Sequence, residues 1–136
     1  MSKDAENRIV AQGKWGEVDY AVRLDGSMPA QKDLENLKKE NLKAFVRLDV
    51  LFRYFAQTGK LKPQQFRPLQ GKKARENKLF EFKRDVYRVA CFVIGNKCFL
   101  SHLFGKKDSS KYVNNQIGKA VNIREEYLEW VKKKNK

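Results

Sequence analysis

Residues 79–107 constrain the fold of this chain more than any other part of its sequence. They read LFEFKRDVYRVACFVIGNKCFLSHLFGKK, and most apolar positions hold the β-branched or aromatic side chains that strands prefer. Gly95 and Asn96 stand between two such runs, and both residue types tolerate positive φ, so a tight hairpin turn is predicted there. The stretch therefore predicts three consecutive strands that end in the paired lysines Lys106 and Lys107.

Basic side chains are interleaved with the apolar ones along these predicted strands. They are Lys83, Arg84, Arg88, His102, Lys106 and Lys107. Because strands hold their side chains more rigidly than a flexible tail does, this arrangement indicates a surface shaped to hold an anion. If the turn has two residues, we expect Tyr87 to face His102 and Arg88 to face Ser101, which places Arg88 and His102 on opposite faces of the sheet.

A further strand is predicted near the N-terminus. Apolar and polar residues alternate over residues 17–24, which predicts a strand with one face toward solvent. Asp25 and Gly26 form a turn signal after it. Ser27 is the expected cap of the helix that follows, because Pro29 then falls in the first turn, where its missing N–H costs nothing.

Residues 30–58 have the periodicity of helix, with apolar residues recurring at three- and four-residue steps. One helix of that length would be about 44 Å long, which is more than a small domain usually accommodates. We therefore expect a helical hairpin that breaks near residues 39–41. Gly59 is the natural end of its second helix.

Residues 60–78 are predicted to form a basic and mobile loop, because they contain two prolines, a glycine and a cluster of cations. The cluster consists of Lys72, Lys73 and Arg75. It is either simply solvated or part of a binding surface, since it leads directly into the cationic strands.

The C-terminal part is predicted to be a helix that Asp108, Ser109 or Ser110 can cap, with terminal lysines that suit the negative end of its dipole. Residues 1–7 are expected to be disordered. The chain as a whole is expected to be one α+β domain over residues 1–136. Its expected parts are an N-terminal strand, a helical hairpin packed on a small antiparallel sheet, and a C-terminal helix.

The net charge of +14, from 30 Lys and Arg against 16 Asp and Glu, is far beyond what solubility requires. Nucleic acid is therefore the leading partner class, and an anionic membrane surface, an acidic protein or no polyanion at all are the alternatives. No apolar run approaches the ~18 to 20 residues that span a bilayer. The N-terminal residues lack the apolar core of a signal peptide, so we expect a cytoplasmic protein without membrane partners.

Cys91 and Cys98 are the only cysteines, and the predicted hairpin makes them diagonal neighbours on one face. Two reduced thiols in the core are the favoured interpretation over a disulfide, because the cytosol is reducing. One histidine and two cysteines without CxxC spacing make a zinc site improbable, so no metal is expected.

The order of these segments resembles the RelE/HigB superfamily of toxin ribonucleases, and in particular its phage-derived HigB-like branch. That branch typically has a leucine-rich helical pair, then a segment like L-W-E-L/F-R/K, then Y-R-V, then a strand ending in L-H-x-F-x-K-K, and then a helix. Here the motifs read LFEFK at residues 79–83, YRV at residues 87–89 and SHLFGKK at residues 101–107. The resemblance covers nearly the whole chain from about residue 16 onward and rests on the order and spacing of the motifs together.

The resemblance implies the toxin of a type II toxin–antitoxin system, an mRNA interferase that cleaves mRNA, usually on the ribosome, and inhibits translation. It implies a helix-turn-helix (HigA-like) antitoxin, encoded nearby, as the silencing partner. It also implies that no metal or cofactor is used, since the substrate's own 2′-hydroxyl attacks the adjacent phosphate in a transesterification.

Such a reaction needs cations for the transition state, a base for the 2′-hydroxyl and a proton donor for the leaving oxygen. Arg88 suits the phosphate because its planar fork binds two oxygens at once. Lys106 and Lys107 can stabilise the phosphorane or the leaving group. His102, the only histidine, can act as acid or base with an ordinary pKa of ~6.5. The predicted RNA-binding residues are Lys72, Lys73, Arg75, Lys83, Arg84 and Tyr112.

The chain departs from the RelE branch at two places. Leu79 and Glu81 occupy strand positions where that branch has lysines, although the HigB-like branch shares the glutamate. Val113 lies nearer than Tyr112 to the position of that branch's tyrosine. The identity of the general base therefore stays open.

Less specialised interpretations of the same residues also stay open. Arg88 can pair with Glu81 or Asp85, the two lysines can be surface charges, and His102 can be a packed side chain. The alternative function is a non-catalytic RNA- or ribosome-binding protein on the same fold. A basic structural or regulatory phage protein is a third alternative.

Overall fold

The computed structural model describes residues 8–135, so the predicted disorder of residues 1–7 lies outside the described part. The strands are β1 (Ile9–Gln12), β2 (Glu17–Tyr20), β3 (Phe66–Pro68), β4 (Leu79–Arg84), β5 (Tyr87–Ile94) and β6 (Lys97–Gly105). The helices are α2 (Pro29–Glu40), α3 (Leu42–Thr58), α4 (Lys72–Glu76) and α5 (Ser110–Lys134). The predicted α+β class is confirmed. None of these helices is long and apolar enough to span a membrane.

The sheet is larger and more mixed than the small antiparallel sheet that was expected. It has six strands in the order β1-β2-β6-β5-β4-β3. The three predicted strands β4, β5 and β6 are confirmed as an antiparallel run, but β2 pairs with β6 in parallel. The N-terminal region contributes a hairpin of two strands, β1 and β2, in place of one strand.

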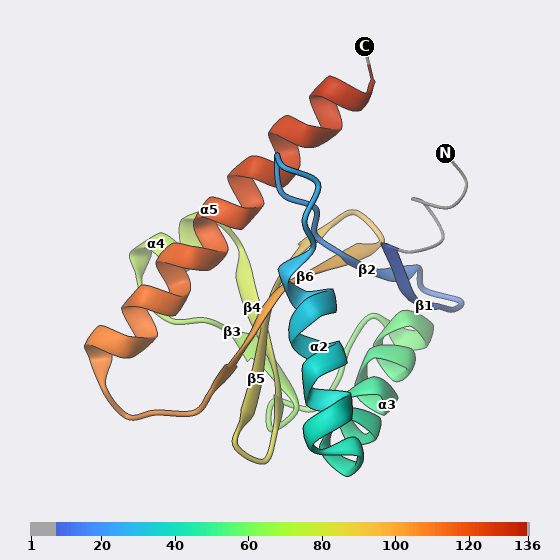
Figure 1. Ribbon diagram of the computed structural model, residues 1–136, viewed down its shortest axis with the longest axis vertical. Coiled ribbons are helices and arrows are strands. Elements are labelled where there is room, and N and C mark those ends of the chain that lie inside the picture. The colour runs from blue at the N-terminus through green and yellow to red at the C-terminus, as the bar shows by residue number, and fades with distance from the viewer. Residues whose placement is uncertain (1–7, 136) are drawn as a thin grey trace.

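Helices cover both faces of this sheet (Figure 1). The predicted helical hairpin, α2 and α3, packs on one face around Leu48, Phe52 and Phe55. The other face, here called the α5 face, is covered by α4 and α5. The prediction that one face of β2 is exposed to solvent is therefore wrong. Asp19 is only 4% exposed on the α5 side, where burial and the neighbouring Glu17 raise its pKa to about 7.

Most of the predicted helix ends are confirmed. The hairpin breaks at Asn41, whose side chain accepts a hydrogen bond from the Ala44 N–H, and α3 ends at Gly59 with φ +72°. Ser109 caps α5 by accepting from the Tyr112 N–H. Ser27 is not the cap of α2, because Met28 holds that position without a side-chain bond.

Residues 60–78 are more ordered than the predicted loop. They contain the edge strand β3 and the short helix α4. Leu69 and Ala74 are buried in the core of the α5 face, which explains why this segment is held against the sheet although its composition is that of a loop.

A β-bulge in β6 changes the register that the sequence predicts. Cys91 pairs with Leu100 and Ala90 pairs with His102, so Ser101 is an extra residue in β6. Beyond the bulge, Arg88 lies opposite Phe104 rather than Ser101. Because the extra residue reverses the alternation of side chains, His102 and Arg88 share the α5 face, and the prediction that they lie on opposite faces is wrong.

The two cysteines lie ahead of the bulge and keep their predicted arrangement. Cys91 is paired with Leu100 and Cys98 with Val93, which makes the cysteines diagonal neighbours in the same core. Both are buried and free, and burial raises the pKa of the Cys91 thiol well above its ordinary value. The interpretation as core thiols is confirmed.

Gly16 lies against the backbone of the turn between β5 and β6. A Cβ there would lie 1.8 Å from the carbonyl oxygen of Asn96, at the turn between β5 and β6. We expect Gly16→Ala to lower the free energy of unfolding by about 2–4 kcal/mol, measured by urea denaturation, because two backbone segments must separate. Gly118→Ala is the matched control, since open space surrounds its Cβ, and it should stabilise α5 by about 0.5–1 kcal/mol. Equal effects of the two substitutions would contradict this account.

Candidate active site

A cleft of ≈ 260 Å³ opens on the α5 face, between the strands β3 to β5 and the connection from β6 to α5. Its basic lining residues are Arg67, Arg88, Lys106 and Lys107, and its acidic ones are Glu81 and Asp108. Pro68, Leu69, Gln70, Phe104 and Val113 complete the lining. Three of the four predicted catalytic residues therefore meet in one cleft, and His102 does not line it.

The strand register explains why these side chains converge. Arg67 pairs with Glu81 between β3 and β4, and Lys83 pairs with Arg88 between β4 and β5. Directly paired residues point to the same face, and Arg88 is in turn paired with Phe104 in the core of the α5 face. Helix α5 begins only at Ser110, so it leaves this end of the sheet face open to solvent and to a ligand.

Arg88 is held in a fixed orientation at the floor of the cleft. It is 7% exposed, and its Nη1 donates to the carbonyl oxygens of Asp85 and Tyr87, each at 2.9 Å. The carboxylate of Asp85 is instead paired with Arg47. Within residues 8–135 no carboxylate forms an ion pair with Arg88, so its remaining N–H groups can bind an incoming anion.

Glu81 is the carboxylate beside it, and its side chain is 5% exposed. Arg67 Nε donates to Glu81 Oε2 at 2.8 Å, which fixes the position of the carboxylate. The sequence does not point to Arg67, because the composition of residues 60–78 predicts a loop. Glu81 stands out in the sequence only as a departure from the RelE branch and as one candidate partner of Arg88; in the structure its partner is Arg67. The signal that could have found both is the cross-strand pairing of β3 with β4.

The pKa of Lys83 reflects the positive charges gathered around the cleft. Its pKa is lowered, first by burial and then by the charges of Arg67, Arg88 and Lys106, while Glu81 acts in the opposite direction. Four cations from β3, β4, β5 and the end of β6 are thus close enough to repel one another. A site built in this way binds an anion favourably, because the anion relieves that repulsion.

Hydrogen bonds hold the backbone at the end of β6 on two sides, and they fix the position of Lys106 and Lys107. The Lys106 N–H donates to the Val86 carbonyl at 2.7 Å, and the Gly105 N–H donates to the Tyr112 hydroxyl at 3.2 Å. The ammonium of Lys107 lies 4.7 Å from the centre of the Tyr112 ring. Tyr112, predicted to bind RNA, therefore braces the connection that carries Lys106 and Lys107.

His102 lies in the core beneath α5, completely buried. Its Nδ1 is 2.9 Å from Ser101 Oγ, and its Nε2 is 2.9 Å from Gln116 Oε1 on α5. Burial lowers its pKa to about 4. A neutral, enclosed imidazole of this kind joins β6 to α5 and suits a positioning residue.

This burial makes His102 a source of acid sensitivity. In the unfolded chain the histidine has an ordinary pKa near 6.5. The folded state therefore keeps its full stability from neutral His102 above that pH, and this contribution is lost as pH falls through about 4. We expect the free energy of unfolding of His102→Gln, measured by urea denaturation, to fall less than that of the wild type between pH 6.5 and 4, by as much as about 3 kcal/mol. Comparing the two proteins at each pH cancels the opposing contribution of Asp19. Parallel pH profiles would contradict the assignment.

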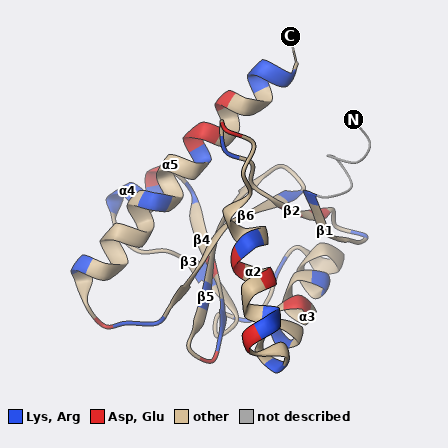
Figure 2. Cartoon of the chain, viewed as in Figure 1, with Lys and Arg blue, Asp and Glu red and all other residues tan. Residues whose placement is uncertain are grey.

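None of the predicted RNA-binding residues, Lys83 and Tyr112 included, is among those that line the cleft. Lys72, Lys73 and Arg75 are exposed on α4, which begins two residues after Gln70 of the cleft lining. Figure 2 shows basic residues on α4 and on the connection between β6 and α5. Arg84 lies in a different place, because it pairs with Tyr87, which packs against the core on the α2 and α3 side.

Comparison with known proteins assigns this chain to no family. No protein-family model matches the sequence, and no curated protein matches it either. Among residues 8–135, no group of three or more His, Cys, Asp or Glu side chains is arranged to hold a metal ion. The cleft itself offers guanidinium, ammonium and carboxylate groups.

Proposed function

We propose that this protein is a RelE-like, HigB-like toxin: an endoribonuclease that cleaves mRNA without a metal and so inhibits translation. The observation that carries the proposal is the convergence of Arg88, Lys106 and Lys107 on one cleft that also holds a fixed carboxylate, Glu81. The motif order over residues 79–107 supports the same class. Ribosome-bound mRNA is the proposed substrate, and a helix-turn-helix antitoxin is the proposed regulator.

The proposed reaction is attack of the substrate's 2′-hydroxyl on the adjacent phosphate. Glu81 takes the proton of the 2′-hydroxyl, since its carboxylate is fixed in the cleft by Arg67. A bond forms between the 2′-oxygen and phosphorus, and the bond from phosphorus to the 5′-oxygen breaks. The products are a 2′,3′-cyclic phosphate and a strand with a 5′-hydroxyl.

The cations have distinct roles in this proposal. Arg88 binds the non-bridging phosphate oxygens, whose negative charge grows in the transition state. Lys106 and Lys107 stabilise the same charge from the other side of the cleft. Lys83, which does not line the cleft but is paired with Arg88 across β4 and β5, is the proposed donor of a proton to the leaving 5′-oxygen, and its lowered pKa suits that role.

Inducible expression in a bacterial host tests the proposal. We expect the wild type to arrest growth and to produce mRNA fragments, and Lys106→Ala/Lys107→Ala to relieve both. The control is Lys39→Ala/Lys43→Ala, which removes the same charge from exposed positions of α2 and α3. Normal growth with well-expressed wild-type protein, or equal relief by the control, would contradict the proposal.

A second candidate is a non-catalytic RNA- or ribosome-binding protein. The exposed cations of α4 beside the cleft favour it, since backbone electrostatics alone can supply RNA affinity. Association with ribosomes at low salt without mRNA fragments would identify this case. Absence of both binding and cleavage would remove both RNA-directed candidates.

A further inference from the structure

Helix α3 exposes an apolar stripe on the side of the molecule opposite the cleft. Leu42, Val46, Val50 and Tyr54 follow one another at four-residue steps, and they are 57%, 47%, 54% and 58% exposed. Four-residue spacing places side chains in one continuous ridge along a helix. Scattered apolar residues on a surface need no explanation, but a ridge of this length does.

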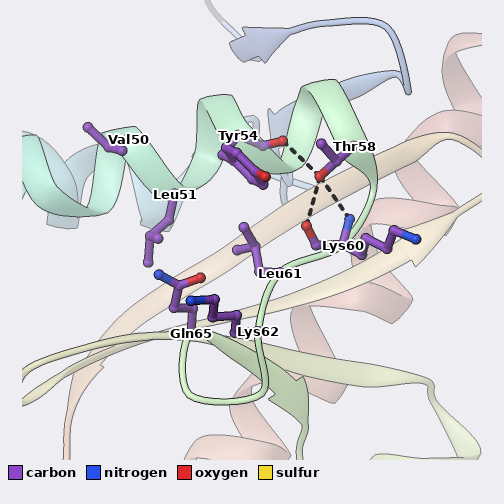
Figure 3. A pocket seen from close by; sticks show the side chains of 8 residues that line it. All are labelled: Val50, Leu51, Tyr54, Thr58, Lys60, Leu61, Lys62 and Gln65. Carbon is purple, nitrogen blue, oxygen red and sulfur yellow. Dashed lines mark hydrogen bonds between the residues drawn. The ribbon is translucent and has the colours of Figure 1, made fainter.

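Two cavities flank the C-terminal half of this ridge. One, of ≈ 470 Å³, lies between α3 and residues 60–65, and the other, of ≈ 450 Å³, lies between α3 and β1. Val50 and Tyr54 line both and so form the wall between them. Figure 3 shows Leu51 and Leu61 in the first cavity beside Tyr54. The ridge and its two cavities, residues 42–65 with β1, are here called the α3 surface.

The wall of the first cavity is held in place by hydrogen bonds. The Thr58 hydroxyl lies 3.1 Å from the Tyr54 carbonyl oxygen and 2.7 Å from that of Lys60 (Figure 3). The Lys60 N–H also donates to this hydroxyl at 3.3 Å. The segment that follows α3 is thereby fixed against the helix, so the cavity is preformed rather than opened by a ligand.

Charge identifies the kind of partner. The residues that line the two cavities include the cations Arg53, Lys60 and Lys62 and no carboxylate. The nearby carboxylate of Asp49 is already paired with Arg53. Since the whole chain carries +14, a second copy would bring like charges together at this surface. An acidic partner is attracted to it.

We propose that the α3 surface binds an amphipathic helix of an acidic partner protein. The apolar residues of that helix, at three- and four-residue steps, fill the two cavities on either side of Val50 and Tyr54. Its carboxylates lie against Lys60 and Lys62 of the first cavity, since Arg53 is already paired with Asp49. The inference does not depend on the nuclease proposal, because α3 covers the sheet face opposite the cleft.

The probe is a fluorescent helical peptide of about 18 residues, long enough to cover the ridge, with leucine at every third or fourth position and glutamate at most others. We measure its binding to the full chain by anisotropy in physiological salt. Binding should weaken by about tenfold or more with Val50→Glu. The matched control is Leu24→Glu, which adds the same charge at an exposed leucine whose N–H is bonded to Glu126 of α5, and it should bind as the wild type does.

A scrambled peptide of the same composition distinguishes this site from general charge attraction, and it should bind about tenfold more weakly. Equal binding of the scrambled peptide, or equal loss in both variants, would overturn the proposal. Displacement of the peptide by single-stranded RNA, or a wild-type dimer that Val50→Glu dissociates, would overturn it as well. RNA cleavage by Val50→Glu should stay unchanged, so the two proposals fail independently.

Discussion

Arg88→Ala is expected to lower the rate of mRNA cleavage by about 10²–10³-fold, the usual effect of removing one preorganised donor from a transition-state site. Arg88 is the most buried cation of the cleft, at 7% exposure, and its orientation is fixed by two backbone carbonyls. Arg88→Lys should recover only part of the rate, because an ammonium lacks the planar fork that holds two oxygens. The measurement is primer extension on mRNA in a cell-free translation system, where free and ribosome-bound message are both present.

The control for bulk charge is Arg53→Ala, which removes one guanidinium from α3 on the far side of the sheet. It should cleave at the wild-type rate. Thermal melts accompany both variants, because Arg88 also holds the turn between β4 and β5. A folded Arg88→Ala protein that cleaves normally would exclude this arginine from the site, and equal losses in both variants would indicate general RNA affinity only.

Glu81→Gln is expected to lower cleavage by about 10²–10⁴-fold, the range for loss of a general base. The amide keeps the size of the side chain and can still accept a hydrogen bond from Arg67, but it cannot take the 2′-hydroxyl proton. Binding of mRNA should change little, so the effect should fall on the rate of cleavage rather than on affinity. Single-turnover cleavage and filter binding measure the two quantities separately.

Two comparisons make this result specific. Glu125→Gln removes a carboxylate from an exposed position of α5 and should leave cleavage unchanged. A message with a 2′-deoxy sugar at the cleavage position should resist the wild type, since the attacking group is then missing. Cleavage by Glu81→Gln at the wild-type rate would show that this carboxylate only positions Arg67.

Local signals predicted the ends of most elements. Gly59 ends α3 in the left-handed conformation, Asn41 breaks the helical hairpin, and Ser109 caps α5. Gly95, with φ +61°, turns the chain between β5 and β6. Each of these depends on the dihedral freedom or the side-chain oxygen of one residue and on its near neighbours, so the sequence alone is enough to find them.

The candidate site was predicted only in part. Arg88, Lys106 and Lys107 were found because they stand at fixed places in strands that the sequence makes plain. Arg67 was missed, and the role of Glu81 was left open, because β3 is too short and too polar to be recognised without its partner β4. His102 was assigned from its chemistry, but its surroundings depend on packing against Gln116 of α5.

Periodicity and turn chemistry in short windows thus define α2, α3, α5 and the strands β4, β5 and β6, and composition defines the basic character of the chain. Long-range contacts decide the rest: the parallel pairing of β2 with β6, the bulge at Ser101 that brings Arg88 and His102 to one face, and the cover on both faces of the sheet. The physical reason is that pairing and burial depend on residues far apart along the chain. Whether a lysine or a carboxylate faces solvent, core or cleft is settled only when those distant partners meet.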